Sequence, residues 1–277
     1  MNLNQLLTNI EQVDPEIYDR LDSRRSAMKG FVKAGGKVAL AAVPVMLGGM
    51  FKKAYAGTAT MPSIVDVLNF ALTLEYLESE FYLTGLKTSG LIPLGVPHKG
   101  IRQIANHEQA HVLFLTQTIT SLGGTPVPKP TFDFTAGNTF PTVFSSYDVF
   151  LAIAQAFEDT GVRAYKGQAP NLMSSNAVLT AALQIHSVEA RHASHIREER
   201  SMRAMDETIR PWITGNSTAG IGSAVQANYA GEELTNQAGI EIVNINGYDI
   251  CFEDATEAFD EILTMDQVLT IVDPFIV

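Results

Sequence analysis

Residues 185–196 read IHSVEARHASHI, and this stretch decides how the rest of the chain is interpreted. In a helix, Glu189 and His192 lie one turn apart on one face. Ile185 and Ile196 share that face, so they direct it towards an apolar core. A buried carboxylate and imidazole are unfavourable unless they are paired or bind a metal. The stretch therefore predicts a helix that carries two polar groups into the interior.

The same pattern occurs 81 residues earlier (189 − 108), where Glu108 and His111 lie between Ile104 and Leu115 on an apolar stripe. With 17 Glu and 6 His in 277 residues, chance gives about 0.4 Glu-x-x-His pairs (6 × 17/277), and the chain has two. At i, i+3 on a helix, these two side chains can reach one metal ion. The repetition favours a shared site over two unrelated surface pairs.

A second repetition involves a glutamate followed seven residues later by a tyrosine. Glu75 precedes Tyr82, and Glu158 precedes Tyr165 (158 − 75 = 83). In order, the chain thus reads Glu, Glu-x-x-His, Glu, Glu-x-x-His, each in its own apolar segment. Glu78 shares the face of Glu75 only loosely, and the tyrosine spacing selects Glu75 as the candidate.

Four helices are expected, over about residues 63–87, 97–122, 146–166 and 176–205. Ser63 with Asp66 three residues later resembles a capping box, and Gly123-Gly124 ends the second helix. Residues 123–145 hold four prolines and four phenylalanines without a helical period. Such a long connection suits a crossover that makes the third helix parallel to the second. The expected fold is an all-α core, a four-helix bundle with a long crossover.

Residues 208–277 differ from the bundle. The Gly-rich beginning predicts a loop, and IEIVNINGYDICF predicts a β-hairpin around Asn246-Gly247. Thr264 with Gln267 predicts the start of a short final helix before Pro274. We interpret this part as an irregular extension that packs on the bundle, with a separate interaction module as the alternative. The expected domains are 1–56, 57–207 and 208–277.

The repeated pattern offers six candidate ligands, the carboxylates of four glutamates and the imidazoles of two histidines. This set suits two divalent iron ions, with manganese as the alternative. Four negative charges neutralise two dications, whereas zinc favours fewer ligands and tetrahedral geometry. Open coordination positions would bind oxygen or peroxide. Tyr82 and Tyr165 are either core aromatics with a satisfied hydroxyl, or catalytic residues that hydrogen-bond a ligand carboxylate or act as an oxidation sink. His107 adjoins Glu108 and points off the stripe.

The whole pattern resembles the ferritin-like superfamily, whose carboxylate bundles take one Glu from each of two helices and Glu-x-x-His from the other two. It also resembles the branch that includes plant desiccation-related proteins and exported bacterial ferritin-like proteins. The resemblance covers about residues 63–205. By analogy it implies a ferroxidase, peroxidase or manganese-catalase-like activity in stress protection. The metal ligands that it implies are Glu75, Glu108, His111, Glu158, Glu189 and His192.

Residues 1–56 resemble a twin-arginine export signal. Arg24-Arg25 is followed by a weakly apolar run and by Ala54-Tyr55-Ala56, which suits a cleavage site. The match is imperfect because Lys33 and Lys37 interrupt the apolar run. An amphipathic or membrane-anchoring N-terminal helix is the alternative. The interpretation predicts an exported, periplasmic protein that has no membrane contact after the signal is removed.

Composition narrows the classes of partner. Hydrophobic residues make up 46% of the chain and charged residues 18%, as in a globular protein with a substantial core. Cleavage after Ala56 would leave 11 Lys and Arg against 25 Asp and Glu, a net charge of −14, which repels nucleic acid and anionic lipid. Cys251 is the sole cysteine, which excludes an intrachain disulfide and a rubredoxin-type iron site; we expect it to be buried.

Two functional classes follow from the sequence. The first is a di-metal oxidoreductase that acts on Fe(II), oxygen or peroxide. The second is a non-catalytic, metal-binding or structural stress-related protein with the same bundle. The resemblance also allows a homodimer. Metal content and peroxide-driven oxidation would separate the two classes.

Overall fold

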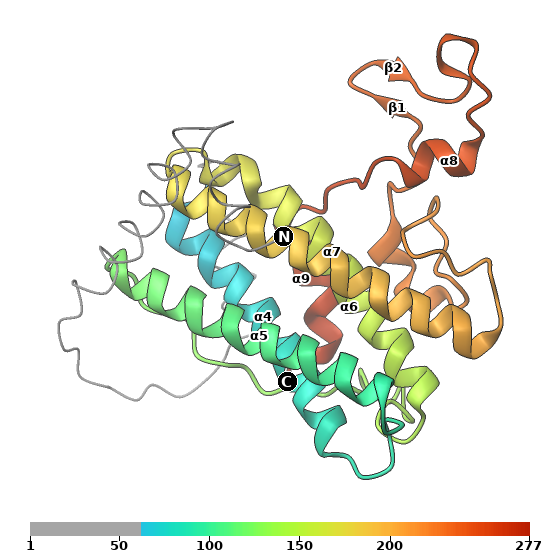
Figure 1. The fold of residues 1–277 in the computed structure, drawn as a ribbon. Coiled ribbons are helices and arrows are strands. Elements are labelled where there is room, and N and C mark those ends of the chain that lie inside the picture. Colours follow the sequence, from blue (N-terminus) through green and yellow to red (C-terminus); the bar gives the residue numbers. More distant parts are fainter. Residues whose placement is uncertain (1–61) are drawn as a thin grey trace, which may run out of the picture.

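The computed structural model describes residues 62–277, so the expected export signal lies outside the described residues. Four long helices form a bundle (Figure 1): α4 (Ile64–Lys87), α5 (Val96–Ser121), α6 (Tyr147–Gln168) and α7 (Asn176–Ala204). Helix α4 packs mainly against α5, and α6 packs mainly against α7. The predicted all-α core is confirmed. Within residues 62–277, no helix has both the length and the apolar character to cross a membrane.

Serine caps set the first residue of three bundle helices. The Ser63 side chain accepts a hydrogen bond from the Asp66 backbone N–H, and Asp66 accepts one from the Ser63 backbone, which completes the predicted capping box. Ser146 and Ser175 cap α6 and α7 in the same way, through the N–H three residues later. These caps satisfy backbone donors that the first helical turn leaves free. The helix starts are therefore encoded locally.

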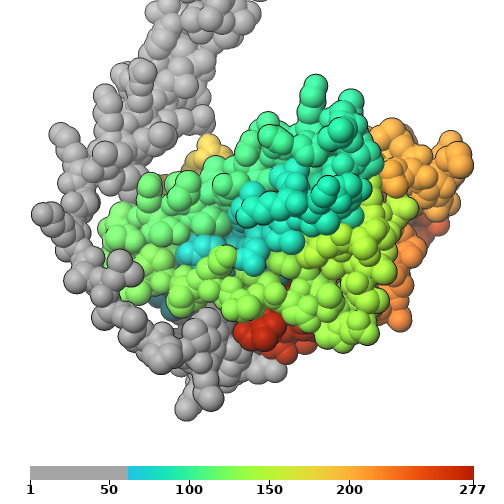
Figure 2. Space-filling model, turned by 90° about the horizontal axis from the view of Figure 1, so that it is seen from below, coloured from blue at the N-terminus to red at the C-terminus, as the bar shows by residue number. Residues whose placement is uncertain are grey.

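The segment between α5 and α6 is the expected crossover, and its aromatic residues attach it to the bundle. Phe134 is buried and contacts Phe81 of α4 edge to face, with ring centroids 5.3 Å apart. Phe132 forms an isolated β-bridge with Ile276, so the C-terminal residues lie beside the crossover on the surface (Figure 2). The crossover is thus held in place by contacts with both the bundle and the C-terminal residues.

The C-terminal part is irregular, as expected, but its hairpin lies elsewhere. Strands β1 (Asn236–Gln237) and β2 (Ile240–Glu241) pair antiparallel around Ala238 and Gly239, both at positive φ. Such a two-residue turn matches the twist of a hairpin. The prediction of a hairpin around Asn246-Gly247 is wrong, because those residues form the short 3-10 helix η3 (Ile245–Gly247), and the paired strands flank Ala238 and Gly239 instead.

The remaining elements are short, and the final helix starts where expected. Thr264 and Gln267 form a capping box before α9 (Met265–Val272). Cys251 is exposed rather than buried, and its Sγ accepts a hydrogen bond from the Asp254 backbone N–H at the start of α8 (Phe252–Glu257). Its place at a helix start on the surface explains the difference. These elements are η1 (Ala169–Leu172), η2 (Ser223–Tyr229), α8 (Phe252–Glu257), α9 (Met265–Val272) and η4 (Asp273–Phe275).

Two buried arginines attach the C-terminal part to the bundle. Arg163 of α6 forms an ion pair with Glu232 (Nε to Oε1, 2.6 Å) and donates a hydrogen bond to the Glu261 carbonyl at 2.9 Å. Arg197 of α7 forms a two-point contact with Asp159 of α6, which also accepts a hydrogen bond from Tyr229 at 2.8 Å. Because a buried charge is costly when unpaired, these contacts specify how the tail lies on the helices.

Candidate metal centre

The four bundle helices bring six polar side chains to one level of the core. Helices α4 and α6 each supply one glutamate, and α5 and α7 each supply a Glu-x-x-His pair. All four carboxylates are fully buried, His192 is 4% exposed, and His111 is half-buried. The six predicted residues are thus brought together: Glu75, Glu108, His111, Glu158, Glu189 and His192.

These side chains form two overlapping groups, each of which could hold one metal ion. Within each group, one donor atom per residue lies within 4.8 Å of all the others. Glu108 and Glu189 belong to both groups, so their carboxylates lie between the two positions. Two glutamates on facing helices α5 and α7 therefore have the placement that bridging carboxylates require. The groups are Glu75, Glu108, His111 and Glu189, and Glu108, Glu158, Glu189 and His192.

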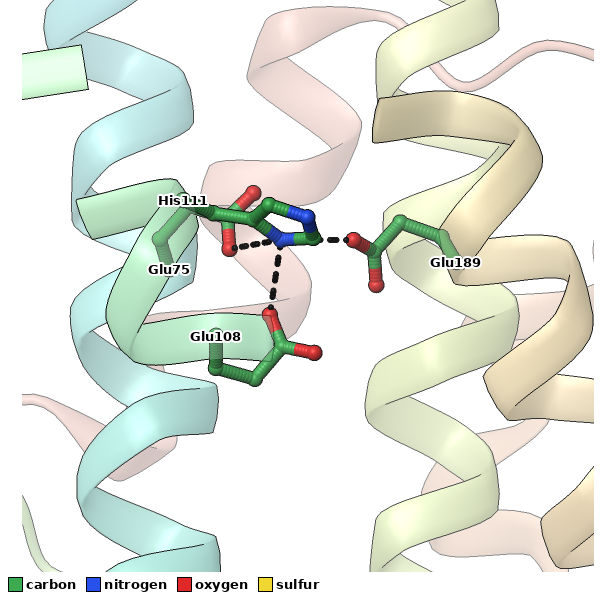
Figure 3. A group of neighbouring side chains, drawn as sticks. All are labelled: Glu75, Glu108, His111 and Glu189. Carbon is green, nitrogen blue, oxygen red and sulfur yellow. Dashed lines mark hydrogen bonds and ion pairs between the residues drawn. The ribbon is translucent and has the colours of Figure 1, made fainter. Parts of the chain in front are cut away.

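The first group converges on Nδ1 of His111, as Figure 3 shows. This atom lies 3.2 Å from Glu75 Oε2, 3.1 Å from Glu108 Oε2 and 3.2 Å from Glu189 Oε1. The imidazole thus faces three carboxylates from three helices through one nitrogen. One nitrogen with three carboxylate oxygens around it is a donor set for a divalent cation.

The second group converges on Nδ1 of His192, which lies 2.8 Å from Glu108 Oε1 and 3.4 Å from Glu158 Oε2. Several of these atoms are close without the alignment of a hydrogen bond. Within residues 62–277, the buried atoms of the cluster without a hydrogen-bond partner are Glu108 Oε1, Glu158 Oε2, both Glu189 carboxylate oxygens and His192 Nδ1. Buried polar atoms normally have partners, so unsatisfied atoms that converge fit a metal cation.

The two tyrosines cross between the helices that carry the single glutamates. Tyr82 of α4 donates to Glu158 Oε1 of α6 at 2.5 Å, and Tyr165 of α6 donates to Glu75 Oε1 of α4. Each hydroxyl therefore orients the glutamate of the opposite helix. The structure thus agrees with the interpretation in which each tyrosine forms a hydrogen bond to a carboxylate of the cluster. The exchange gives the centre an approximate two-fold symmetry.

Comparison with protein families matches the chain to the ferritin-like domain over residues 63–201. The chain belongs to the ferritin-like domain family. The matched residues contain all four bundle helices up to Ser201 and all six side chains of the cluster. Comparison with curated proteins gives no match.

Burial and mutual charge set the protonation of this ferritin-like cluster without metal. Burial alone would lower the pKa of His192, but Glu158 and its other carboxylate neighbours raise it to about 12. Burial would raise the pKa of Glu189, but the two histidines lower it to about 2. Burial raises the pKa of Glu158 to about 7 and that of Glu108 well above its usual value. Protons on the histidines thus compensate the carboxylates, as cations would.

Glu78 is a fifth buried carboxylate beside the centre, and the sequence interpretation set it aside. Burial, and then the charge of Glu189, raise its pKa well above the usual value. The equivalent position on α6 is Gly161 (78 + 83 = 161), and a Cβ there would lie 3.3 Å from Glu78 Oε1. The glycine therefore leaves the space that the Glu78 carboxylate uses. The sequence held one signal for this role of Glu78. The 83-residue offset that relates Glu75 to Glu158 also relates Glu78 to Gly161, a residue without a side chain.

His107 also contacts the centre, although it was expected to point away. Its Nδ1 lies 2.9 Å from Nε2 of His192, and the two ring planes are nearly parallel, with centroids 5.2 Å apart. Burial, and then the neighbouring His192, lower its pKa. Helical periodicity predicted the face of His107 on α5 correctly, but not that α7 would bring His192 to that face. Only the packing of α5 on α7 shows this contact.

Proposed function

We propose that this chain is a di-metal carboxylate protein that binds two iron ions, or two manganese ions, and acts as an oxidoreductase on Fe(II), oxygen or peroxide in stress protection. The observation that carries the proposal is the sharing of Glu108 and Glu189 by both groups of donors. Glu75 and His111 would complete one position. Glu158 and His192 would complete the other.

The chemistry of the donors supports iron or manganese. Carboxylate and imidazole ligands suit these divalent ions, and a six-residue set divides into two positions with room for further ligands. Four carboxylates match the charge of two dications. The unsatisfied atoms of Glu108, Glu189 and His192 are those that such ions would engage. Bound iron or manganese would supply two-electron redox chemistry towards oxygen or peroxide.

The protein's own residues would orient and enclose this chemistry. Tyr82 and Tyr165 hold the single glutamates through hydrogen bonds. Both hydroxyls are buried, and burial together with the adjacent carboxylate charge raises their pKa values well above the usual one. They therefore stay protonated and act as donors at neutral pH. The surrounding apolar bundle limits the access of water to the centre.

Metal loading tests the proposal directly. We expect about two Fe(II) or Mn(II) per chain by mass spectrometry of anaerobically loaded protein, followed by oxidation of bound Fe(II) with oxygen or peroxide. Glu108→Gln should reduce binding at both positions, whereas Glu75→Gln should reduce binding at one. Glu80→Gln is the matched control, because Glu80 lies on α4 and pairs with Lys129 away from the cluster.

The outcomes separate the functional classes. Two ions with rapid oxidation support the oxidoreductase. Two ions without oxidation by either oxidant leave a non-catalytic metal-binding protein. No binding of iron or manganese, or equal binding by the Glu108→Gln variant, would overturn the di-metal assignment.

We also propose that the chain is exported by the twin-arginine route to the periplasm, as in the exported and desiccation-related branch that its sequence resembles. The support is the order of Arg24-Arg25, the apolar run and Ala54-Tyr55-Ala56. A reporter fused to residues 1–56 should be exported, and changing Arg24 and Arg25 to Lys should block it. Export that continues unchanged in the double variant would contradict the assignment.

A further inference from the structure

A three-residue contact runs from the surface to His192. The exposed side chain of Gln103 lies one turn before His107 on α5, with Nε2 to Nε2 at 2.7 Å. His107 Nδ1 lies 2.9 Å from His192 Nε2, and the rings are nearly parallel at 14°. On its other side, His192 presents Nδ1 to Glu108. The ring of His192 is therefore held between a carboxylate cluster and a second imidazole.

The donor and acceptor roles follow from the side of His192 that faces the cluster. If Nδ1 supplies a lone pair to a cation, the proton of the neutral ring must be on Nε2. This N–H then donates to Nδ1 of His107, whose own proton lies on Nε2. The Gln103 amide oxygen can accept a hydrogen bond from this Nε2–H, because a half-turn of the amide exchanges the positions of its O and N. All three side chains are then satisfied in one consistent arrangement.

The other half of the centre lacks this arrangement. The position equivalent to His107 is Val188 (107 + 81 = 188), which cannot accept a hydrogen bond. Among residues 62–277, the hydrogen bonds and ion pairs of His111 all run through Nδ1, towards the carboxylates. The ligand residues repeat between the two halves, but the support for the two histidines does not.

We propose that His107, held by Gln103, is a positioning residue that fixes the tautomer and orientation of His192, so that the two metal positions differ in affinity. This inference rests on the proposed di-metal function. Outer hydrogen bonds to a ligating histidine typically change metal affinity about 10- to 100-fold. The His192 position should therefore bind more tightly and fill first.

Calorimetric titration of the whole metal-free protein with Mn(II) tests this difference. Wild type should show two classes of site. His107→Leu should weaken one class about 10- to 100-fold and leave the other unchanged. His107→Asn, which keeps a hydrogen-bond acceptor of similar reach, should recover part of the loss. His98→Leu is the control, because His98 is half-exposed at the start of the same helix.

A second readout does not depend on metal. Nitrogen NMR shifts of ¹⁵N-histidine-labelled, metal-free protein report the hydrogen bonding of each ring N–H. The Nε2 signal of His192 should show a hydrogen-bonded N–H in wild type and move in His107→Leu, but not in His98→Leu. Circular dichroism of each variant shows that it is folded, so an unfolded His107→Leu would be replaced by Gln103→Leu.

The results separate this inference from the proposed function. If wild type binds two Mn(II) and His107→Leu alters neither class, or weakens both equally, the inference is wrong and the di-metal function stands. If wild type binds neither Mn(II) nor Fe(II), the proposed function fails. In that case an unchanged His192 Nε2 signal in His107→Leu would overturn the inference separately.

Discussion

Tyr82 of α4 donates a hydrogen bond to Glu158 of α6, with 2.5 Å between the two oxygens. The two residues are 76 positions apart in the chain, and both are fully buried. Tyr165 makes the reciprocal bond to Glu75. The helices that carry the single glutamates are thus joined at the level of the centre. Each carboxylate keeps one oxygen for the tyrosine and turns the other towards the cluster.

Tyr82→Phe should weaken the metal position that contains Glu158. The variant removes the hydrogen bond that orients this carboxylate and should also lower the free energy of unfolding by about 1–3 kcal/mol. Mn(II) titration and urea denaturation measure both effects. Tyr147→Phe is the matched control. Tyr147 lies on α6 about three turns before Glu158, and its hydroxyl donates a hydrogen bond to Glu199 at 2.8 Å. Equal Mn(II) affinity in the two variants would contradict the role of Tyr82.

The metal-free protein should become less stable as the pH rises above about 6.5. Carboxylate neighbours raise the pKa values of His111 and His192, that of His192 to about 12, against about 6.5 in an unfolded chain. Their stabilisation is therefore complete below about pH 6.5 and is lost as the pH rises towards 12. Glu158, with its pKa raised to about 7, acts in the same direction.

The expected loss is up to about 1.4 kcal/mol per pH unit for each proton that only the folded state retains. Urea denaturation at pH 6.5, 7.5 and 8.5 measures it. With saturating Mn(II) the trend should diminish or reverse, since metal replaces these protons and its binding improves as they leave. A metal-free protein that gains stability over this range would be inconsistent with the histidine protonation described above.

Gly161→Ala should reduce metal binding, although alanine in a helix interior usually stabilises by about 0.5–1 kcal/mol. The new Cβ would lie 3.3 Å from Glu78 Oε1 and 3.7 Å from the Cγ of Glu189. It would therefore press on a carboxylate of the centre. In a Glu78→Ala background the closest contact is absent, so the same change should have less effect. A double-mutant cycle measured by Mn(II) titration tests the coupling, and additive effects would argue against it.

Glu232→Ala should destabilise the attachment of the C-terminal part. It leaves the fully buried guanidinium of Arg163 without its carboxylate partner, which typically costs about 3–5 kcal/mol. Urea denaturation and limited proteolysis after residue 205 would detect the loss. Lys129→Ala removes a surface ion pair with Glu80 and should change stability by less than about 1 kcal/mol. Similar losses in the free energy of unfolding for the two substitutions would show that the buried ion pair stabilises the protein no more than the surface pair does.

Local sequence signals were sufficient for the bundle and for the set of candidate ligands. Caps such as Ser63 with Asp66 act over three residues, and the Glu-x-x-His spacing acts over one helical turn. The repetition at 81 and 83 residues then related the four helices to one another. The hairpin was misplaced because Asn246-Gly247 is a strong local turn signal, whereas Ala238 adopts a positive φ that alanine disfavours, so only the pairing of the flanking strands identifies the turn.

By itself, the sequence determined the helices, their polar stripes and the residues that could meet in the core, because these depend on short-range periodicity and capping. Only the tertiary structure decided which other side chains reach the centre. Glu78 does so through the space at Gly161, and His107 does so because α7 brings His192 to it. The Arg163 contact with Glu261 likewise joins residues 98 positions apart. Such contacts depend on how helices and tail pack in three dimensions, which no local pattern specifies.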